Sequence, residues 1–136
     1  MVNIADHNNT KVFRYADAIL MMAECYLELD DTDNAMRYLN MVKDRAQIAR
    51  YETFKNYDHL HEEIERERAR GLFGEFQRKY DLVRWGSWYR QTFDYTDYKS
   101  LQDNILPCHE YYPIPDKEVT YSGNALDNDA YAEWGL

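Results

Sequence analysis

The stretch ERARGLFGEFQRKYDLVRWG, residues 67–86, mixes ion-pair partners with aromatic side chains more densely than a solvent-facing helix usually does. It holds most of the only basic run in the chain, whose members are Arg66, Arg68, Arg70, Arg78, Lys79, Arg84 and Arg90. Carboxylates interleave with that run at Glu67, Glu75 and Asp81. Arginine is the cation best suited to bidentate pairing with a carboxylate at partly buried positions. The pattern therefore favours ion pairs within the chain over the binding of phosphates.

Composition indicates one soluble globular domain that does not bind nucleic acid in general. The 136 residues are 45% hydrophobic and 30% charged, and the net charge of -9 opposes binding to phosphates. Aromatic residues reach 15%, with 13 tyrosines, which suits wet interfaces or stacking on a ligand. No apolar run approaches the roughly 20 residues that span a bilayer. Residues 1–6 lack the basic start and apolar core of a signal peptide.

The two cysteines are too few for a disulfide framework. Cys25 falls inside an apolar helical stripe, and Cys108 follows Pro107 in a predicted loop. We expect both to be free thiols rather than partners in one bridge.

Residues 13–48 predict an antiparallel helical hairpin of tetratricopeptide character. The first apolar stripe consists of Ala16, Leu20, Ala23 and Leu27, and the second of Ala35, Leu39, Val42 and Ala46. Between them, Thr32 or Asp33 can cap the second helix. The small residues on both stripes let two helices approach closely. One such pair is no array, so the hairpin needs other partners to bury its core.

A third long helix is predicted within residues 58–86, from about His59 to Trp85, with Asp58 as its cap. Its predicted apolar face consists of Leu60, Ile64, Leu72, Phe76 and Tyr80, with Arg68 intruding. Gly71 and Gly74 lie inside it, each costing up to about 1 kcal/mol relative to Ala. We expect a bend or a weak turn there.

The helical period disappears in residues 87–136, which predict an irregular, aromatic-rich segment that wraps the helices. Its large rings are Trp88, Tyr89, Phe93, Tyr95, Tyr98, Tyr111, Tyr112, Tyr121, Tyr131 and Trp134. A disordered tail would lack that aromatic density.

Nothing in the sequence forms a catalytic constellation. Glu62, Glu63, Glu65 and Glu67 are typical of one solvated helix face rather than of a facing carboxylate pair. His59 and His61 lie among them without the H-E-x-x-H spacing that sets two imidazoles on one helical face. We therefore expect no enzyme activity, no metal site and no cofactor.

The stretch that opens this section resembles the signature of the SusD/RagB family, E-R-x-R-E-L-x-F-E-G-x-R-x-x-D-L-x-R-W. The chain retains Glu67, Arg68, Arg70, Leu72, Glu75, Arg78, Asp81, Leu82, Arg84 and Trp85. It departs at Gly71, Gly74 and Phe76, where the family usually has Glu, an aromatic residue and Gly.

Three more segments agree, in family order. They are RYADAILMMAECYLEL at residues 14–29, YLNMVKDRA at residues 38–46, and YPIP at residues 112–115 followed by NALDNDAY at residues 124–131. In the last of these, Ala125 and Asp129 replace the family's prolines. The matches span almost the whole chain.

The resemblance implies that the matched motif residues strap the fold together. The residues assigned this role are Arg14, Asp17, Glu67, Arg68, Glu75, Arg78, Asp81, Arg84, Trp85, Pro113 and Pro115. In the family this motif lies in the C-terminal part of a longer protein, packed against tetratricopeptide-like helices. The chain is then expected to be such a C-terminal part, or a short relative, without the family's secretion signal and lipid-bearing cysteine.

The resemblance also implies a function: non-enzymatic binding of oligosaccharides at the outer surface of the bacterial outer membrane. Delivery would go to a SusC-like transporter dependent on TonB, over which the protein acts as a lid. No ligand residues of the family fall in the matched motifs. Composition alone suggests Trp88, Tyr89, Tyr95 and Tyr98 for stacking on sugars, although a role in the core is the more usual one for such residues. Relatives also bind peptides, and the alternative function is a tetratricopeptide-like adaptor for a protein partner or peptide.

Overall fold

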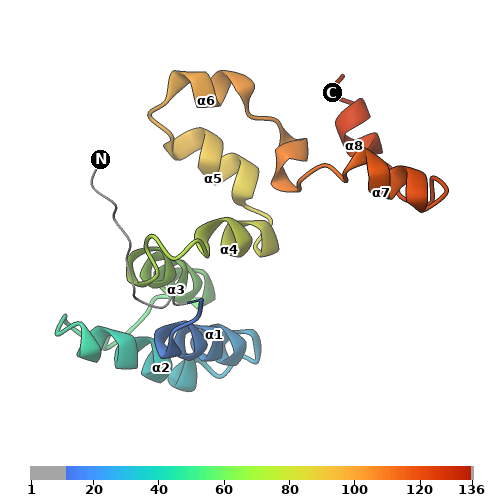
Figure 1. The fold of residues 1–136 in the computed structure, drawn as a ribbon. Helices are drawn as coiled ribbons and strands as arrows, with labels where there is room; N and C mark the ends of the chain where they lie inside the picture. Colours follow the sequence, from blue (N-terminus) through green and yellow to red (C-terminus); the bar gives the residue numbers. More distant parts are fainter. Residues whose placement is uncertain (1–11, 136) are drawn as a thin grey trace, which may run out of the picture. The chain divides into compact units, whose positions relative to one another are not determined.

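The computed structural model describes residues 12–135 and falls into two compact units, the first ending at Arg78 and the second beginning at Lys79. All regular structure within residues 12–135 is helical, which confirms the predicted mostly α fold (Figure 1). In this described range, no helix has both the length and the apolar character needed to cross a membrane.

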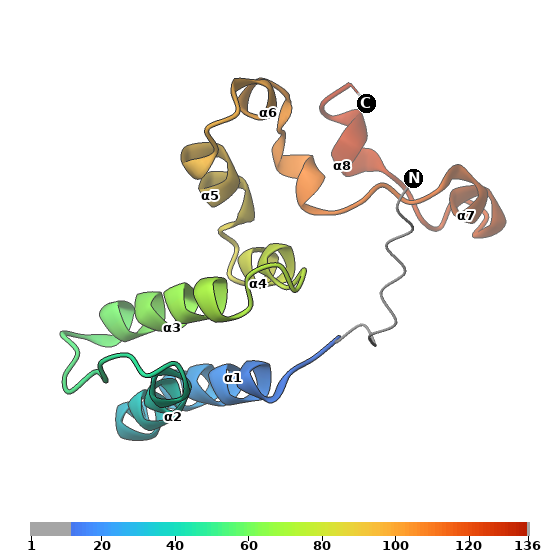
Figure 2. The ribbon, with the colours of Figure 1, turned by 60° about the vertical axis from the view of Figure 1, so that its left-hand side comes forward.

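The first unit is a hairpin with a third helix against it. The elements are α1 (Tyr15–Glu28), α2 (Thr32–Arg45) and α3 (Tyr57–Gly71), and α3 packs chiefly against α1. Both views show α1 and α2 side by side, joined by a short loop (Figures 1 and 2). The core consists of Leu20, Ala23, Leu27, Ala35, Leu39, Val42, Leu60 and Ile64. The predicted hairpin is confirmed, whereas its tetratricopeptide character stays a prediction.

Burial of apolar side chains explains why the apolar faces of α1 and α2 pack together. Leu20, Leu27 and Leu39 are fully buried, and each contributes about 1.5–3 kcal/mol by leaving water. Ala23 and Ala35 are also fully buried, so small side chains stand where the helices come closest. The last predicted stripe residue, Ala46, is exposed because α2 ends before it.

The helix caps differ from those predicted. Asp31, rather than Thr32 or Asp33, caps α2: its side chain accepts a hydrogen bond from the Asn34 backbone amide at 3.1 Å. This bond makes the pKa of Asp31 lower than usual, because the side-chain and backbone amides of Asn34 stabilise the carboxylate.

The third helix also begins earlier than expected. Asn56, rather than Asp58, caps α3 by accepting a hydrogen bond from the His59 backbone amide at 3.0 Å. Asp58 lies inside the first turn of α3. At the start of both helices the sequence offers several adjacent residues that could cap the helix. Only the path of the backbone decides which of them becomes the N-cap.

The long helix predicted up to Trp85 is two helices. α3 ends at Gly71, a turn occupies residues 72–77, and α4 (Arg78–Arg84) follows. Gly74 and Phe76 adopt left-handed backbone angles, with φ of 76° and 61°, which an α-helix cannot accommodate. The predicted apolar face stops with Leu72: Phe76 is 89% exposed and Tyr80 is 66% exposed.

The second unit contains short helices where an irregular segment was predicted. After α4 come α5 (Trp88–Tyr95), α6 (Lys99–Asn104), a 3₁₀ turn (Pro107–Glu110), α7 (Asp116–Tyr121) and α8 (Asp129–Ala132). The prediction failed because elements of four to eight residues complete too few turns to show a hydrophobic period. Its small core consists of Leu82, Trp88 and Ile105, with Val83, Trp85 and Tyr89 packed against it. That this segment wraps the first three helices stays a prediction.

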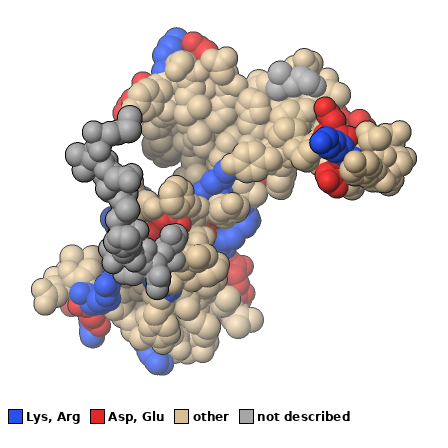
Figure 3. Space-filling model, in the orientation of Figure 1, with Lys and Arg blue, Asp and Glu red and all other residues tan. Residues whose placement is uncertain are grey.

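Both cysteines are free, as predicted. Cys108 is buried, whereas Cys25 is exposed and does not belong to the buried stripe of α1. On the face drawn in Figure 3, acidic and basic side chains lie interspersed over the first unit.

Candidate functional site

A buried ion pair joins α3 to α1. The guanidinium of Arg68 lies 2.8 Å from the carboxylate of Asp17, and the two side chains are only 3% and 5% exposed. Two charges taken out of water in this way are stable only together, because either one left alone would be a buried, uncompensated charge. The pair thus fixes how α1 and α3 face each other.

Two glutamates of α3 are buried beside exposed arginines one turn later. Glu67 accepts a hydrogen bond from Arg70 at 3.1 Å, and Glu63 accepts one from Arg66 at 2.6 Å. The carboxylates are buried while the arginines remain largely exposed. The predicted solvated glutamate face is therefore wrong for Glu63 and Glu67, because packing of α3 on the hairpin covers that side of the helix.

Arg14 clamps the turn that ends α3. Its Nε donates to both carboxylate oxygens of Glu75 at 2.8 and 2.9 Å, and its Nη2 donates to the carbonyl of Gly71 at 2.5 Å. The hydrogen bond to Glu75 raises the pKa of Arg14. Two residues far apart in sequence thereby hold the chain at the point where the helix was predicted to continue.

Within the second unit, Asp81 and Arg84 pair inside α4. Arg84 Nε lies 3.1 Å from Asp81, whose side chain is buried, and the Arg84 guanidinium lies 4.6 Å from the ring centre of Trp85. Trp85 and Arg78 are each half-buried. These contacts are the kind that internal strapping requires, and the strapping role itself stays a prediction.

The prolines of the YPIP segment are exposed, and the segment is held by another residue. Asn128 accepts a hydrogen bond from the Ile114 amide at 2.8 Å and donates one to the Ile114 carbonyl at 2.9 Å. Pro113 and Pro115, on either side of Ile114, have no backbone N–H, so the N–H of Ile114 is the one donor among these three residues. No local pattern singles out Asn128 for this role, although it lies in the matched segment of residues 124–131.

Tyr51 is a second residue that the sequence analysis missed. Its backbone exchanges hydrogen bonds with the Asn40 side chain at 2.8 and 2.9 Å, and its hydroxyl donates to Glu63. The buried Lys43 lies 3.9 Å from its ring centre. Tyr51 therefore anchors the loop between α2 and α3, and no local pattern around it predicts this.

The four aromatic residues suggested for sugar stacking do not form one platform. Trp88 belongs to the core of the second unit, and Tyr89 packs against that core. Tyr95 and Tyr98 are 82% and 74% exposed. Only these last two present open ring faces.

A lysine also lies over the Trp88 ring. Lys79 Nζ lies 5.2 Å from the Trp88 ring centre and 4.0 Å from that of Tyr112, and it donates to the His109 carbonyl at 3.3 Å. Cation–π contacts of this kind stabilise the packing around Trp88. They leave it poorly suited to stacking on a ligand.

The histidines near the start of α3 serve local contacts. His61 Nδ1 lies 3.3 Å from Glu65, and His59 Nδ1 accepts a hydrogen bond from the Lys55 amide at 3.2 Å. Within residues 12–135, no three His, Cys, Asp or Glu side chains gather closely enough to hold a metal ion.

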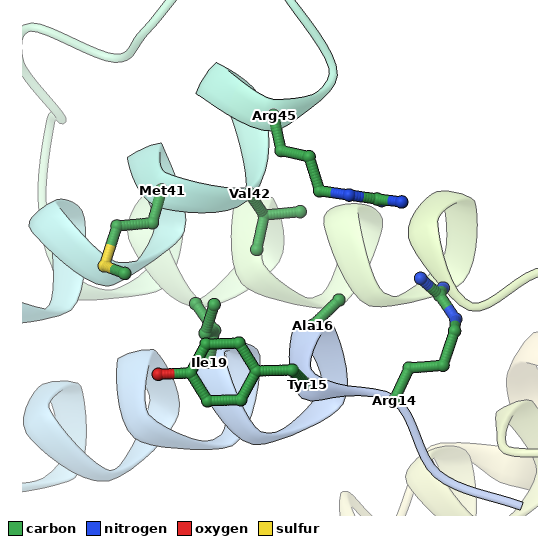
Figure 4. Close-up of a pocket in the computed structure, with 7 residues that line it drawn as sticks. All are labelled: Arg14, Tyr15, Ala16, Ile19, Met41, Val42 and Arg45. Atoms are coloured by element: carbon green, nitrogen blue, oxygen red, sulfur yellow. The ribbon is translucent and has the colours of Figure 1, made fainter.

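A pocket lies between the start of α1 and the end of α2. Its volume is about 260 Å³, and its lining consists of Arg14, Tyr15, Ala16, Ile19, Met41, Val42 and Arg45 (Figure 4). The two arginines stand at one end, while Tyr15, Ile19 and Met41 form an apolar wall at the other. The pocket can therefore take a group that is charged on one side and apolar on the other.

Comparison with known proteins identifies the family. The SusD family matches residues 2–131. The chain belongs to the SusD family. This confirms the resemblance seen in the motifs.

Two SusD relatives illustrate the extent of the similarity. The SusD-like protein P25 of Formosa agariphila is 39% identical over 128 residues, which cover 90% of this chain and 24% of that protein. The crystal structure of a SusD superfamily protein from Bacteroides vulgatus ATCC 8482 aligns with a TM-score of 0.71 at 31% identity, over 82% of this chain and 25% of that one. The chain thus spans about a quarter of the length of each relative.

Proposed function

We propose that the chain is the scaffold part of a surface protein that binds oligosaccharides at the bacterial outer membrane, without catalysis, and passes them to a SusC-like TonB-dependent transporter. The observation that carries this proposal is the match of the SusD family to residues 2–131. Because the chain spans about a quarter of its relatives, binding and delivery are properties proposed for the whole protein.

The contacts within the first unit support the scaffold role. Its charged motif residues face partners inside the chain, as in the pairs of Arg68 with Asp17 and Arg14 with Glu75. Side chains used in this way fix the packing of helices and are not free to choose among the hydroxyls of a sugar.

Open aromatic rings support a contribution to ligand binding by the second unit. Tyr95 and Tyr98 present exposed faces at the two ends of the loop between α5 and α6. Sugars bind by stacking on such faces, with polar groups selecting among hydroxyls. Each stack must offset the entropy lost when a flexible ligand is immobilised, so two rings alone give weak binding.

The hairpin of α1 and α2 favours a second candidate, an adaptor that binds a protein partner or a peptide. The two functions predict different binding partners and ligands for the full-length protein. Under the first, affinity purification from native membranes should recover a large TonB-dependent barrel, and a glycan array should show binding.

Recovery of a helical or extended peptide partner without the barrel, together with an unreactive glycan array, would refute the first function and support the second. The 136-residue chain alone should bind soluble starch, xylan, mucin glycans and levan poorly in calorimetry. Micromolar binding of any of these polymers by the chain would contradict its assignment as scaffold.

A further inference from the structure

The pocket between α1 and α2 carries an excess positive charge. Around it, Arg14 pairs with Glu75, and Asp44 pairs with Arg50 at 2.5 and 2.6 Å. Arg45 has no hydrogen-bond or ion-pair partner among residues 12–135. In a chain of net charge -9, a pocket whose surplus charge among the described residues is positive marks a place where an anion is favoured.

Arg45 has an alternative use as a basic residue in the last turn of α2, where it faces the negative end of the helix dipole. That interaction needs only the charge near the helix end. Figure 4 shows the Arg45 side chain extended, with its guanidinium at the same end of the pocket as that of Arg14. The extended fork can still take a planar, bidentate anion such as a carboxylate.

The opposite wall of the pocket offers an aromatic face. Tyr15 is 78% exposed in the first turn of α1, and its ring lies beside Ile19 (Figure 4). The exposed Met41 of α2 adds a polarisable, apolar contact. A ring with apolar C–H groups on one face and a carboxylate at its edge could stack on Tyr15 and pair with Arg45 at the same time.

We propose that this pocket binds one acidic sugar unit, with its carboxylate on Arg45 and its ring face on Tyr15. The proposal rests on the oligosaccharide-binding function proposed above and names the class of glycan as acidic. The pocket volume of about 260 Å³ lies just below the roughly 300 Å³ at which small-molecule sites usually begin, so it fits one sugar ring and not a longer chain.

The expected affinity is weak, with Kd on the order of 1 mM, because one charged contact and one stack must offset the cost of association. NMR titration of the ¹⁵N-labelled 136-residue chain can measure such binding. The probe is trigalacturonic acid, and its fully methyl-esterified form is the matched neutral ligand. A tri-glutamate peptide blocked at both ends by acetylation and amidation carries the same number of carboxylates, three, without a sugar ring.

Binding of the acid should shift the amide signals of Tyr15, Ile19 and Met41. Arg45→Gln and Tyr15→Ala should each weaken it by about fivefold or more. Arg37→Gln, the same charge change at an exposed position of α2 outside the pocket lining, should leave Kd unchanged. Because both pocket side chains are exposed, the variants should keep the wild-type spectrum in the absence of ligand.

Equal binding of the acid and the methyl ester, or an unchanged Kd in Arg45→Gln, would overturn the acidic-sugar proposal while leaving glycan binding intact. Equal or tighter binding of tri-glutamate would overturn it in favour of a peptide ligand. The absence of any shift at 10 mM trigalacturonic acid would also overturn it. None of these results bears on the recovery of a transporter, so the proposed function can fail or stand independently.

Discussion

Replacing Phe76 by Gly should stabilise the first unit by about 1 kcal/mol. Phe76 adopts a φ of 61°, in the left-handed region, which costs a non-glycine residue roughly 1–2 kcal/mol. Its ring is 89% exposed, so little apolar burial is lost with it. Glycine enters at a penalty of about 0.5–1 kcal/mol in the unfolded chain, which offsets part of the gain. The signature of the SusD family also has Gly at this position.

The turn contains its own control. Phe73 is 87% exposed and, unlike Phe76, does not have a positive φ. Phe73→Gly should therefore destabilise by about 0.5–1 kcal/mol, since the unfolded chain gains freedom and no strain is relieved. Phe76→Ala keeps a Cβ and hence the strain, and should change stability little.

Urea denaturation followed by far-UV circular dichroism would measure these differences, and a gain of 1 kcal/mol would raise Tm by about 4 °C in a chain of this size. The reasoning fails if Phe76→Gly and Phe73→Gly lower stability equally, because the left-handed backbone would then carry no cost at Phe76.

Three further predictions concern the contacts described above. Asp17→Ala should cost about 3–5 kcal/mol, because it removes one charge of a buried ion pair with Arg68, and chemical denaturation would show it; a loss under 1 kcal/mol would contradict a buried pair. Asp81→Ala should lower the free energy of unfolding by roughly 1–3 kcal/mol and thereby lower Tm clearly. An unchanged Tm would refute its strapping role. The hydrogen bond to Glu28, with burial, raises the pKa of Tyr57 to about 12. Because the folded pKa lies above the usual 10, its stabilisation is complete below pH 10 and is lost as the pH rises from 10 to 12. NMR titration of Tyr57 should therefore give a value that falls toward 10 in Glu28→Gln, and a wild-type value near 10 would contradict the bond.

The hairpin was predictable because its information is local. Residues Leu20, Ala23 and Leu27 recur at the helical period, as do Ala35 and Leu39, and each stripe identifies its own buried face without reference to the other. The alternation of arginines and carboxylates likewise predicted internal pairing, because an unpaired buried charge is too costly to persist.

The partners themselves were not predictable in the same way. Arg68 pairs with Asp17 of α1, and Glu75 pairs with Arg14 just before that helix, across long separations in sequence. Several arginines and several acids compete within the motif, and only the packing of α3 on α1 brings these particular groups together. The sequence pattern thus restricts the type of contact, while distance in the folded chain selects its members.

The aromatic residues show the same division most clearly. Composition marked Trp88, Tyr89, Tyr95 and Tyr98 alike, since a ring has the same chemistry in a core and on a surface. Tertiary structure separates them, burying Trp88 under Lys79 and leaving Tyr95 and Tyr98 open. The amino-acid sequence alone therefore determined the helical class, the hairpin and the SusD family, all of which depend on local order along the chain. The break after Gly71, the choice of ion-pair partners and the accessible rings were decided only by the tertiary structure, because each depends on which distant segment occupies the neighbouring space.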